Sequence, residues 1–189
     1  MKAEKLDIHK YGDPVLRQKA QPVGKIDAEI RRLVQEMIDT MRVERGVGLA
    51  AQQVGETRSV CIVDVPDPLD TDENGVRHNP DIAMPMVLVN PEILEFSKQT
   101  EVGDEGCLSF PGIYAPVKRS VEIKLRYQDL ETTQHVVTLK NFVARVAQHE
   151  IDHLNGILLV DRMSRLKKIA LSGQLKRMKK ETQEAIGVA

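Results

Sequence analysis

The feature that most constrains this chain is the stretch Gln148-His149-Glu150-Ile151-Asp152-His153, which contains the pattern H-E-x-x-H. Histidines four residues apart lie on one face of a helix, so both imidazole rings can reach a single metal ion. Glu150 is placed to accept a proton from a water that such an ion activates. Phe142 and Val146 continue the helical spacing, and Gly156 predicts the end of the helix. The pattern therefore predicts a catalytic metal-binding helix.

Length and composition indicate one soluble globular domain. The chain has 189 residues, of which 41% are hydrophobic and 29% charged, and a formal net charge of -1. The small net charge and the absence of tryptophan argue against a protein that binds DNA or stacks single-stranded nucleic acid. We see neither a secretory signal nor an apolar run of about 18 residues that would span a membrane. A cytoplasmic location is therefore expected.

Helical and strand patterns occupy separate stretches of the sequence, which favours an α+β fold. Asp27 as an N-cap and six apolar residues at helical spacing predict a helix from Asp27 to about Val43. The remaining expected elements are a short helix after Asp13, strands at 59–65, 86–90 with 93–96, 117–127 and 136–139, a surface loop at 66–85, the metal helix from a cap at Asn141 to Asn155, and a last helix from Met163 to about Thr182. Cys61 lies among valine and isoleucine and is expected in the core.

Two histidines do not complete a catalytic metal site, which usually has three protein ligands and a water. A third histidine in the extended H-E-x-x-H pattern would fall at Leu159, and a downstream glutamate would be Glu181 or Glu184 in the basic tail. Cys107 is the better candidate, because a thiolate is a strong ligand and Gly106 lets the backbone approach the ion. A purely structural thiol is the alternative for Cys107.

The stretch Gly46–Gln53 holds two glycines and two alanines, so it contributes little core volume. Such residues allow close approach of the backbone, either by another segment of the chain or by a ligand, and the sequence leaves both possibilities open. It contains neither of the glycine-rich patterns that bind phosphate.

Three motifs together resemble those of peptide deformylases: G-Φ-G-Φ-A-A-x-Q at 46–53, E-G-C-L-S at 105–109 and Q-H-E-x-D-H at 148–153. They occur in the family's order, and the resemblance covers about Tyr11 to Arg165. It implies an α+β fold in which antiparallel sheets pack around a central metal-binding helix, followed by a C-terminal helix. It also implies a hydrolase of protein biosynthesis that removes the N-formyl group from the initiator methionine of new polypeptides and releases formate.

The resemblance assigns roles residue by residue. It implies Cys107, His149 and His153 as metal ligands, Glu150 as the proton shuttle, the Gln53 side chain and Leu108 N–H as donors to the formyl oxygen, and the backbones of Val47, Gly48 and Gly106 as partners of the substrate chain. Val47, Phe142 and Val146 are candidate walls for the methionine side chain, although the last two could equally be core. Tyr114 departs from the pattern, because many members carry arginine there.

The donor set alone suits zinc, whereas the resemblance implies Fe²⁺ in the cell, with Zn²⁺, Ni²⁺ or Co²⁺ as substitutes. We expect residues 1–162 to form the catalytic domain and 163–189 a basic helix and tail appended to it. Eight lysines and arginines and no acid lie from Arg162 to Lys180, so the tail is either a solvated helix or a contact with ribosomal RNA.

Two other classes of protein stay open. A zinc-dependent peptidase could use the same helix, but it would need a cleft that admits a chain on both sides of the cleaved bond. The non-enzymatic alternative is a structural metal site or an RNA-binding module. A structural site would be closed by a fourth protein ligand, for which the sequence offers no convincing candidate.

Overall fold

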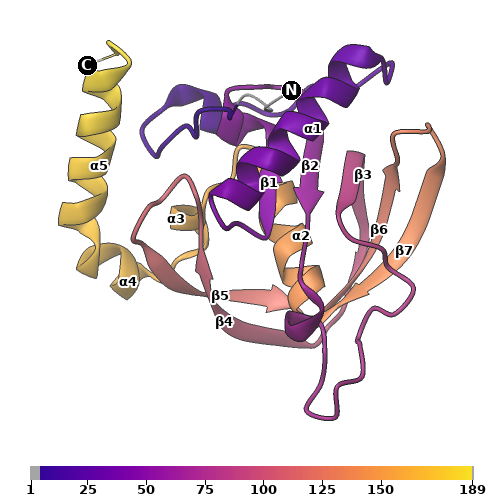
Figure 1. Cartoon of the computed structure of the whole chain (residues 1–189). Helices are drawn as coiled ribbons and strands as arrows, with labels where there is room; N and C mark the ends of the chain where they lie inside the picture. The colour runs from indigo at the N-terminus through magenta and orange to yellow at the C-terminus, as the bar shows by residue number, and fades with distance from the viewer. Residues whose placement is uncertain (1–4, 189) are drawn as a thin grey trace.

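The computed structural model describes residues 5–188. Two antiparallel sheets surround the central helix α2 (Asn141–Leu154), as Figure 1 shows. The larger sheet has the order β1-β2-β3-β6-β7, and the smaller one pairs β4 with β5. The strands are β1 (Gly48–Ala50), β2 (Val60–Val63), β3 (Met86–Phe96), β4 (Thr100–Gly106), β5 (Tyr114–Ser120), β6 (Glu122–Gln128) and β7 (Gln134–Lys140). The expected α+β class is confirmed.

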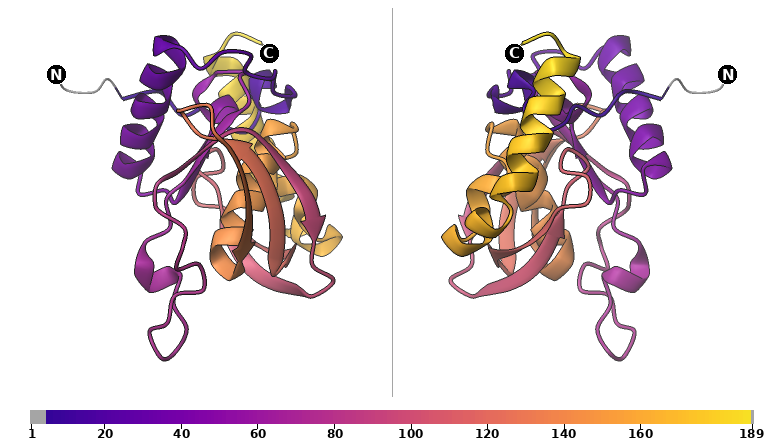
Figure 2. Two further views of the ribbon diagram at one scale, coloured as in Figure 1. Left: turned by 90° about the vertical axis from the view of Figure 1, so that its right-hand side faces the viewer. Right: turned by 90° about the vertical axis from the view of Figure 1, so that its left-hand side faces the viewer.

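The other helices are peripheral to α2. Helix α1 (Ala28–Val43) begins where predicted, because the Asp27 side chain accepts hydrogen bonds from the N–H groups of Glu29 and Ile30. The remaining helical segments are η1 (Pro14–Arg17), η2 (Ala51–Val54), η3 (Asp67–Leu69), α3 (Leu159–Arg162), α4 (Arg165–Ala170) and α5 (Ser172–Ala185). Figure 2 shows α1 and α5 on different flanks of the molecule.

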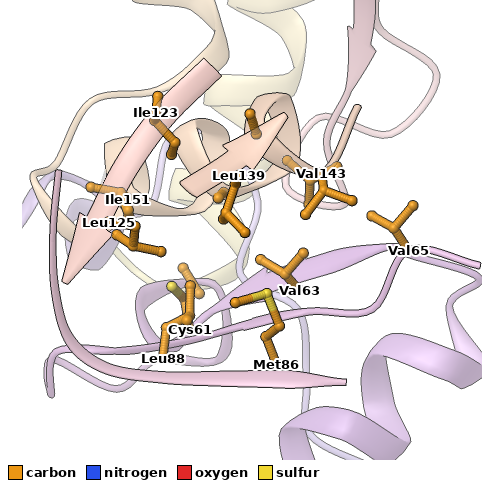
Figure 3. Packing of buried hydrophobic residues seen from close by; sticks show 14 of the residues in the cluster. Cys61, Val63, Val65, Met86, Leu88, Ile123, Leu125, Leu139, Val143 and Ile151 are labelled. Carbon is orange, nitrogen blue, oxygen red and sulfur yellow. The ribbon is translucent and has the colours of Figure 1, made fainter. Parts of the chain in front are cut away.

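The main core lies between α2 and the larger sheet. Cys61 and Leu88 on one side and Leu125 and Leu139 on the other converge beneath the helix, as Figure 3 shows. All four of these side chains are fully buried, so the expectation that Cys61 is a core residue is confirmed. Strand β2 is buried along its whole length because Ile62 faces the opposite cluster, to which α1 contributes. Strand β1 contributes Ala50 to the first cluster, which includes α2, and Leu49 to the second. Packing on both faces therefore fixes the position of β1 against α2.

The prediction of one strand over 117–127 is wrong. The chain leaves the smaller sheet after Ser120 and enters the larger sheet at Glu122. Val121 lies between them, where its N–H donates to the Gln99 carbonyl and its own carbonyl accepts from the N–H of Asn141. Alternation of polar and apolar residues continues across this junction, so a periodicity argument cannot detect that the chain changes sheets.

Strand β4 was not predicted, because its residues alternate weakly and only Glu105 is buried. Residues 86–96 form one bent strand, with an irregular register next to Asn90. Helix α2 has Lys140 rather than Asn141 at its cap and begins with Asn141. It ends as predicted, with Asn155 as C-cap and Gly156 at a φ of 70°.

The single C-terminal helix predicted from Met163 to Thr182 is divided at Leu171 into α4 and α5. Leu175 is buried and Met178 packs against the same cluster, whereas Leu166 and Ile169 are 81% and 61% exposed. The expected single apolar stripe is therefore interrupted, and only α5 contributes to the core. Within residues 5–188, no helix is both long and apolar enough to cross a membrane.

Candidate active site

Three side chains from two parts of the chain meet beside α2. Cys107, just after β4, and His149 and His153, one turn apart on α2, bring one ligand atom each to within 4.8 Å of the others. The Cys107 Sγ lies 3.2 Å from His153 Nε2. A fourth candidate ligand from histidine, cysteine or a carboxylate is absent from this group in the described part of the chain. A sulfur and two imidazoles with an open position fit a catalytic divalent metal ion.

Glu105 orients the first histidine. Its Oε2 lies 2.9 Å from His149 Nδ1, which leaves Nε2 of that ring for a metal ion. The same carboxylate accepts hydrogen bonds from Arg119 and from Arg145. Burial alone would raise the pKa of Glu105, but the hydrogen bonds from His149 and Arg119 lower it to about 2. Glu105 is therefore an anion near neutral pH.

Two further residues of the Q-H-E-x-D-H motif, Asp152 and Gln148, anchor α2 to β5 and α3. Asp152 binds Arg119 of β5 and Arg162 of α3. Gln148 binds the last residue of β5, because its Nε2 donates to the Ser120 carbonyl at 2.9 Å and its Oε1 accepts from the Ser120 N–H at 3.2 Å. These contacts fix the rotation of α2 about its axis, and so the direction of both histidine rings.

Glu150 faces the opposite side of the pocket, toward β1. It is 4% exposed, and its Oε2 has no hydrogen-bond partner within residues 5–188. A Cβ on Gly48 would lie 2.3 Å from Glu150 Oε1, so only glycine allows the acid to come this close to β1. Burial raises the pKa of Glu150 to about 7, which suits a group that must both accept and give a proton near neutral pH.

Gln53 and Leu108 lie on two turns that flank Cys107. Gln53 is 1% exposed, and its Oε1 accepts from the Ala50 N–H at 2.9 Å, which directs its Nε2 toward Cys107 Sγ at 3.5 Å. The Leu108 N–H donates to no other group within residues 5–188. The Gln53 amide therefore lies beside the candidate ligands, and the N–H of Leu108, the residue after Cys107, is left without a partner in the described part of the chain.

A cavity of about 470 Å³ opens at this cluster. Besides the residues described above, its lining includes Val47, Gly48, Gly106, Phe142 and Val146, all of which the sequence singled out. His153 is not among the lining residues and is 1% exposed. The Val47 carbonyl accepts the Asp64 N–H at 2.9 Å, so its own N–H is the group left for another chain.

Tyr114 stands at the mouth of the cavity and is 66% exposed. A Cβ on Gly106 would lie 2.6 Å from Tyr114 Cε1, so the tyrosine ring covers this glycine closely. The residue at which the sequence departs from the expected pattern thus places an aromatic ring against the cavity wall.

A profile of the polypeptide deformylase family matches residues 5–169. The chain belongs to the peptide deformylase family. The peptide deformylase of Thermotoga petrophila is 44% identical over 168 residues, which cover 89% of this chain and 93% of that protein. The peptide deformylase of Picosynechococcus is also 44% identical, over 90% of this chain and 84% of that protein. The chain is therefore an enzyme of a metal-dependent family that acts on nascent peptides.

Solved structures of peptide deformylases share the fold. The crystal structure of the Thermotoga maritima enzyme matches with a TM-score of 0.75 and 42% identity, over 85% of this chain and 99% of that one. A plant peptide deformylase matches with a TM-score of 0.84 and 35% identity, over 96% of this chain and 93% of that one. The fold of this chain is therefore that of the peptide deformylases.

Sequence reasoning did not assign roles to the charged residues around the ligands. Glu105 is part of the E-G-C-L-S motif but has no predicted role there, and Arg119 and Arg145 lie outside all three motifs, yet all three side chains are buried. A signal existed for Arg119, because it follows Ala115 and Val117 at alternate positions on the buried face of β5. A charged residue in such a position requires a buried partner of opposite charge.

Proposed function

We propose that this enzyme hydrolyses the N-formyl group of formylmethionyl nascent peptides and releases formate. The single observation that carries the proposal is the meeting of Cys107, His149 and His153 next to a buried, unpartnered Glu150 in an open cavity. An ion bound by these three side chains would polarise the formyl group and activate water. Fe²⁺ is the ion proposed for the cell, with Zn²⁺, Ni²⁺ or Co²⁺ as substitutes, and the cytoplasm is the proposed location.

In this proposal the protein's own groups have separate tasks. Glu150 takes the proton of the attacking water and returns it to the amine that leaves. The Gln53 amide and the Leu108 N–H donate hydrogen bonds to the formyl oxygen as negative charge develops on it. The Val47 N–H, Gly48 and Gly106 bind the peptide backbone, while Val47, Phe142 and Val146 enclose the methionine side chain. Residues 1–162 would carry all of this chemistry, with 163–189 as an appended helix and tail.

The decisive experiment is a turnover assay on protein purified without oxygen, with its metal content measured in parallel. A formyl-Met-Ala-Ser peptide should yield formate and a free amino terminus, whereas an unformylated peptide of the same length should stay intact. Cleavage of an internal peptide bond without formate release would instead assign the site to a peptidase. A protein that binds metal but acts on neither peptide would contradict the proposal.

Replacing Gln53 by alanine is expected to lower kcat by about 10²–10³-fold, the typical cost of losing one oxyanion donor. The effect should fall on kcat more than on KM, because the donor matters most when the oxygen carries charge. Gln52, which is equally buried but donates to the Gln18 and Leu154 carbonyls instead, provides the matched control. Gln52→Ala should reduce thermal stability and leave kcat within a few-fold of the parent, and equal losses from the two variants would remove Gln53 from this role.

The basic C-terminal segment is proposed to contact ribosomal RNA near the nascent chain. Lys176, Lys179 and Lys180 are exposed on α5, so they can be changed without disturbing the buried Leu175. Replacing the three by glutamine should weaken ribosome binding at low salt. It should also make the plot of log K against log salt concentration less steep, by about 0.7 for each removed cation. A triple replacement of Lys19, Lys25 and Lys98 on the body of the protein is the control, and equal binding by both variants would exclude the segment.

A further inference from the structure

The N-terminal segment His9–Tyr11 forms hydrogen bonds with the backbone carbonyls of Gln53 and Leu108, the two residues proposed as oxyanion donors. The His9 N–H donates to the Gln53 carbonyl at 2.8 Å, and the Tyr11 N–H donates to the Ser109 carbonyl at 2.9 Å. Between these two contacts, the Lys10 Nζ donates to the Leu108 carbonyl at 2.9 Å. Three consecutive residues therefore join the turn that holds Gln53 to the turn that holds Leu108, although the segment lies about a hundred residues from the second turn in sequence.

The direction of the Leu108 N–H depends on two peptide groups. The first contains the Cys107 carbonyl and the Leu108 N–H in one plane, and it is held because the Phe110 N–H donates to that carbonyl at 2.9 Å. The second contains the Leu108 carbonyl, which Lys10 holds. Only the two backbone dihedrals of Leu108 lie between these planes. Lys10 therefore restricts the backbone of Leu108 from its second peptide group.

The Lys10 ammonium is placed specifically rather than left in solvent. It is partly buried at the wall of the catalytic cavity, and burial lowers its pKa while Glu44 and Cys107 oppose that change. Within residues 5–188 it forms no ion pair, so its contact with the Leu108 carbonyl is what offsets the loss of hydration. A second contact of the segment supports the same arrangement, since Tyr11 stacks on Phe110 with ring centroids 4.8 Å apart.

We propose that Lys10 is a positioning residue for deformylation, which holds the Leu108 N–H toward the formyl oxygen by fixing the Leu108 carbonyl. This inference rests on the proposed function. Lys10 does not touch the substrate in this role and acts through the turn at 107–110. Its loss should therefore change the rate of the chemical step more than substrate binding or metal content.

The test compares Lys10→Met, which keeps the aliphatic stem and loses the donor, with Lys10→Arg, which keeps a donor of similar reach. In full-length, metal-loaded protein, Lys10→Met should lower kcat for formyl-Met-Ala-Ser about tenfold and leave KM within about twofold of the parent. The fall in kcat should be smaller than the 10²–10³-fold expected when an oxyanion donor itself is removed. Lys10→Arg should recover most of that loss. Lys19→Met, at an exposed lysine near the same terminus, is the control and should match the parent.

A second readout does not depend on turnover. In the zinc-loaded protein, the Phe110 N–H that closes the 107–110 turn should exchange with solvent several-fold faster in Lys10→Met than in the parent or in Lys10→Arg. An unchanged kcat in Lys10→Met, a loss that arginine does not rescue, or a fall in metal content that parallels the fall in kcat would each overturn the inference. If the parent enzyme releases no formate, the proposed function fails instead, and the two failures are thereby distinguished.

Discussion

Replacing Glu150 by glutamine is expected to lower kcat by about three orders of magnitude, within the 10²–10⁴-fold range typical of general acid–base catalysis. Glutamine has nearly the same shape, so it fits against Gly48 as the acid does, but it cannot take a proton from water at neutral pH. Glu150 does not belong to the group of three candidate ligands. The metal content of the variant should therefore equal that of the parent.

The measurement is formate release together with metal content in the same preparations. Glu95→Gln removes a carboxylate that is 69% exposed and pairs with Lys124, and it should leave both quantities unchanged. Glu150→Ala should lose at least as much turnover as Glu150→Gln. Turnover that stays within tenfold of the parent in either variant would show that another group moves the proton.

The extent to which the sequence predicted the site differs between its parts. The two histidines and Glu150 are adjacent on one helix, so their spacing alone placed them together. Cys107 lies more than forty residues before His149, and no local rule relates them. Elimination of other ligands favoured Cys107, and the three-motif resemblance was needed to include it with Gln53 and Leu108.

The fold was predictable where residues repeat regularly and less so where the chain changes partners. Helix α1 has a cap and a clear apolar face, and both are found in the structure. Strand β4 lacks a buried apolar face, because the two-stranded sheet contacts the core through Ala115 and Val117 of β5 and Glu105 is the one buried residue of β4. The junction at Val121 is likewise set by contacts with Gln99 and Asn141, which only the folded chain brings together.

The glycine-rich stretch shows how a structural and a functional explanation can both hold. Composition left open whether Gly46–Gln53 is approached by the chain or by a ligand. Gly48 is approached by the Glu150 side chain from α2 and also lines the cavity. A side chain at this position would displace Glu150, the proposed proton shuttle. Gly48 therefore serves the proposed chemistry indirectly, by leaving room for Glu150.

Replacing Cys107 by serine is expected to weaken metal binding by more than about a hundredfold, beyond the 10–100-fold typical of losing a partner that only orients a ligand. A serine hydroxyl stays protonated at neutral pH and is a poor ligand, whereas a thiolate is charged and soft. The two histidines would remain in place, because Glu105 still holds His149 and Asp152 still anchors α2 to Arg119. The variant should therefore fold, lose its ion to a chelator and show little turnover.

The chain supplies its own control in Cys61, which is fully buried beneath α2. Cys61→Ala removes a core sulfur, so it should lower the thermal midpoint by a few degrees while keeping the parental metal content. Each variant loses one sulfur, so comparing them separates metal coordination from core packing. Cys107→Ser should lose its metal, whereas Cys61→Ala should lose thermal stability and keep its metal. Full metal occupancy in Cys107→Ser after dialysis against a chelator would remove Cys107 from the ligand set, and with it the open three-ligand site on which the proposed hydrolysis depends.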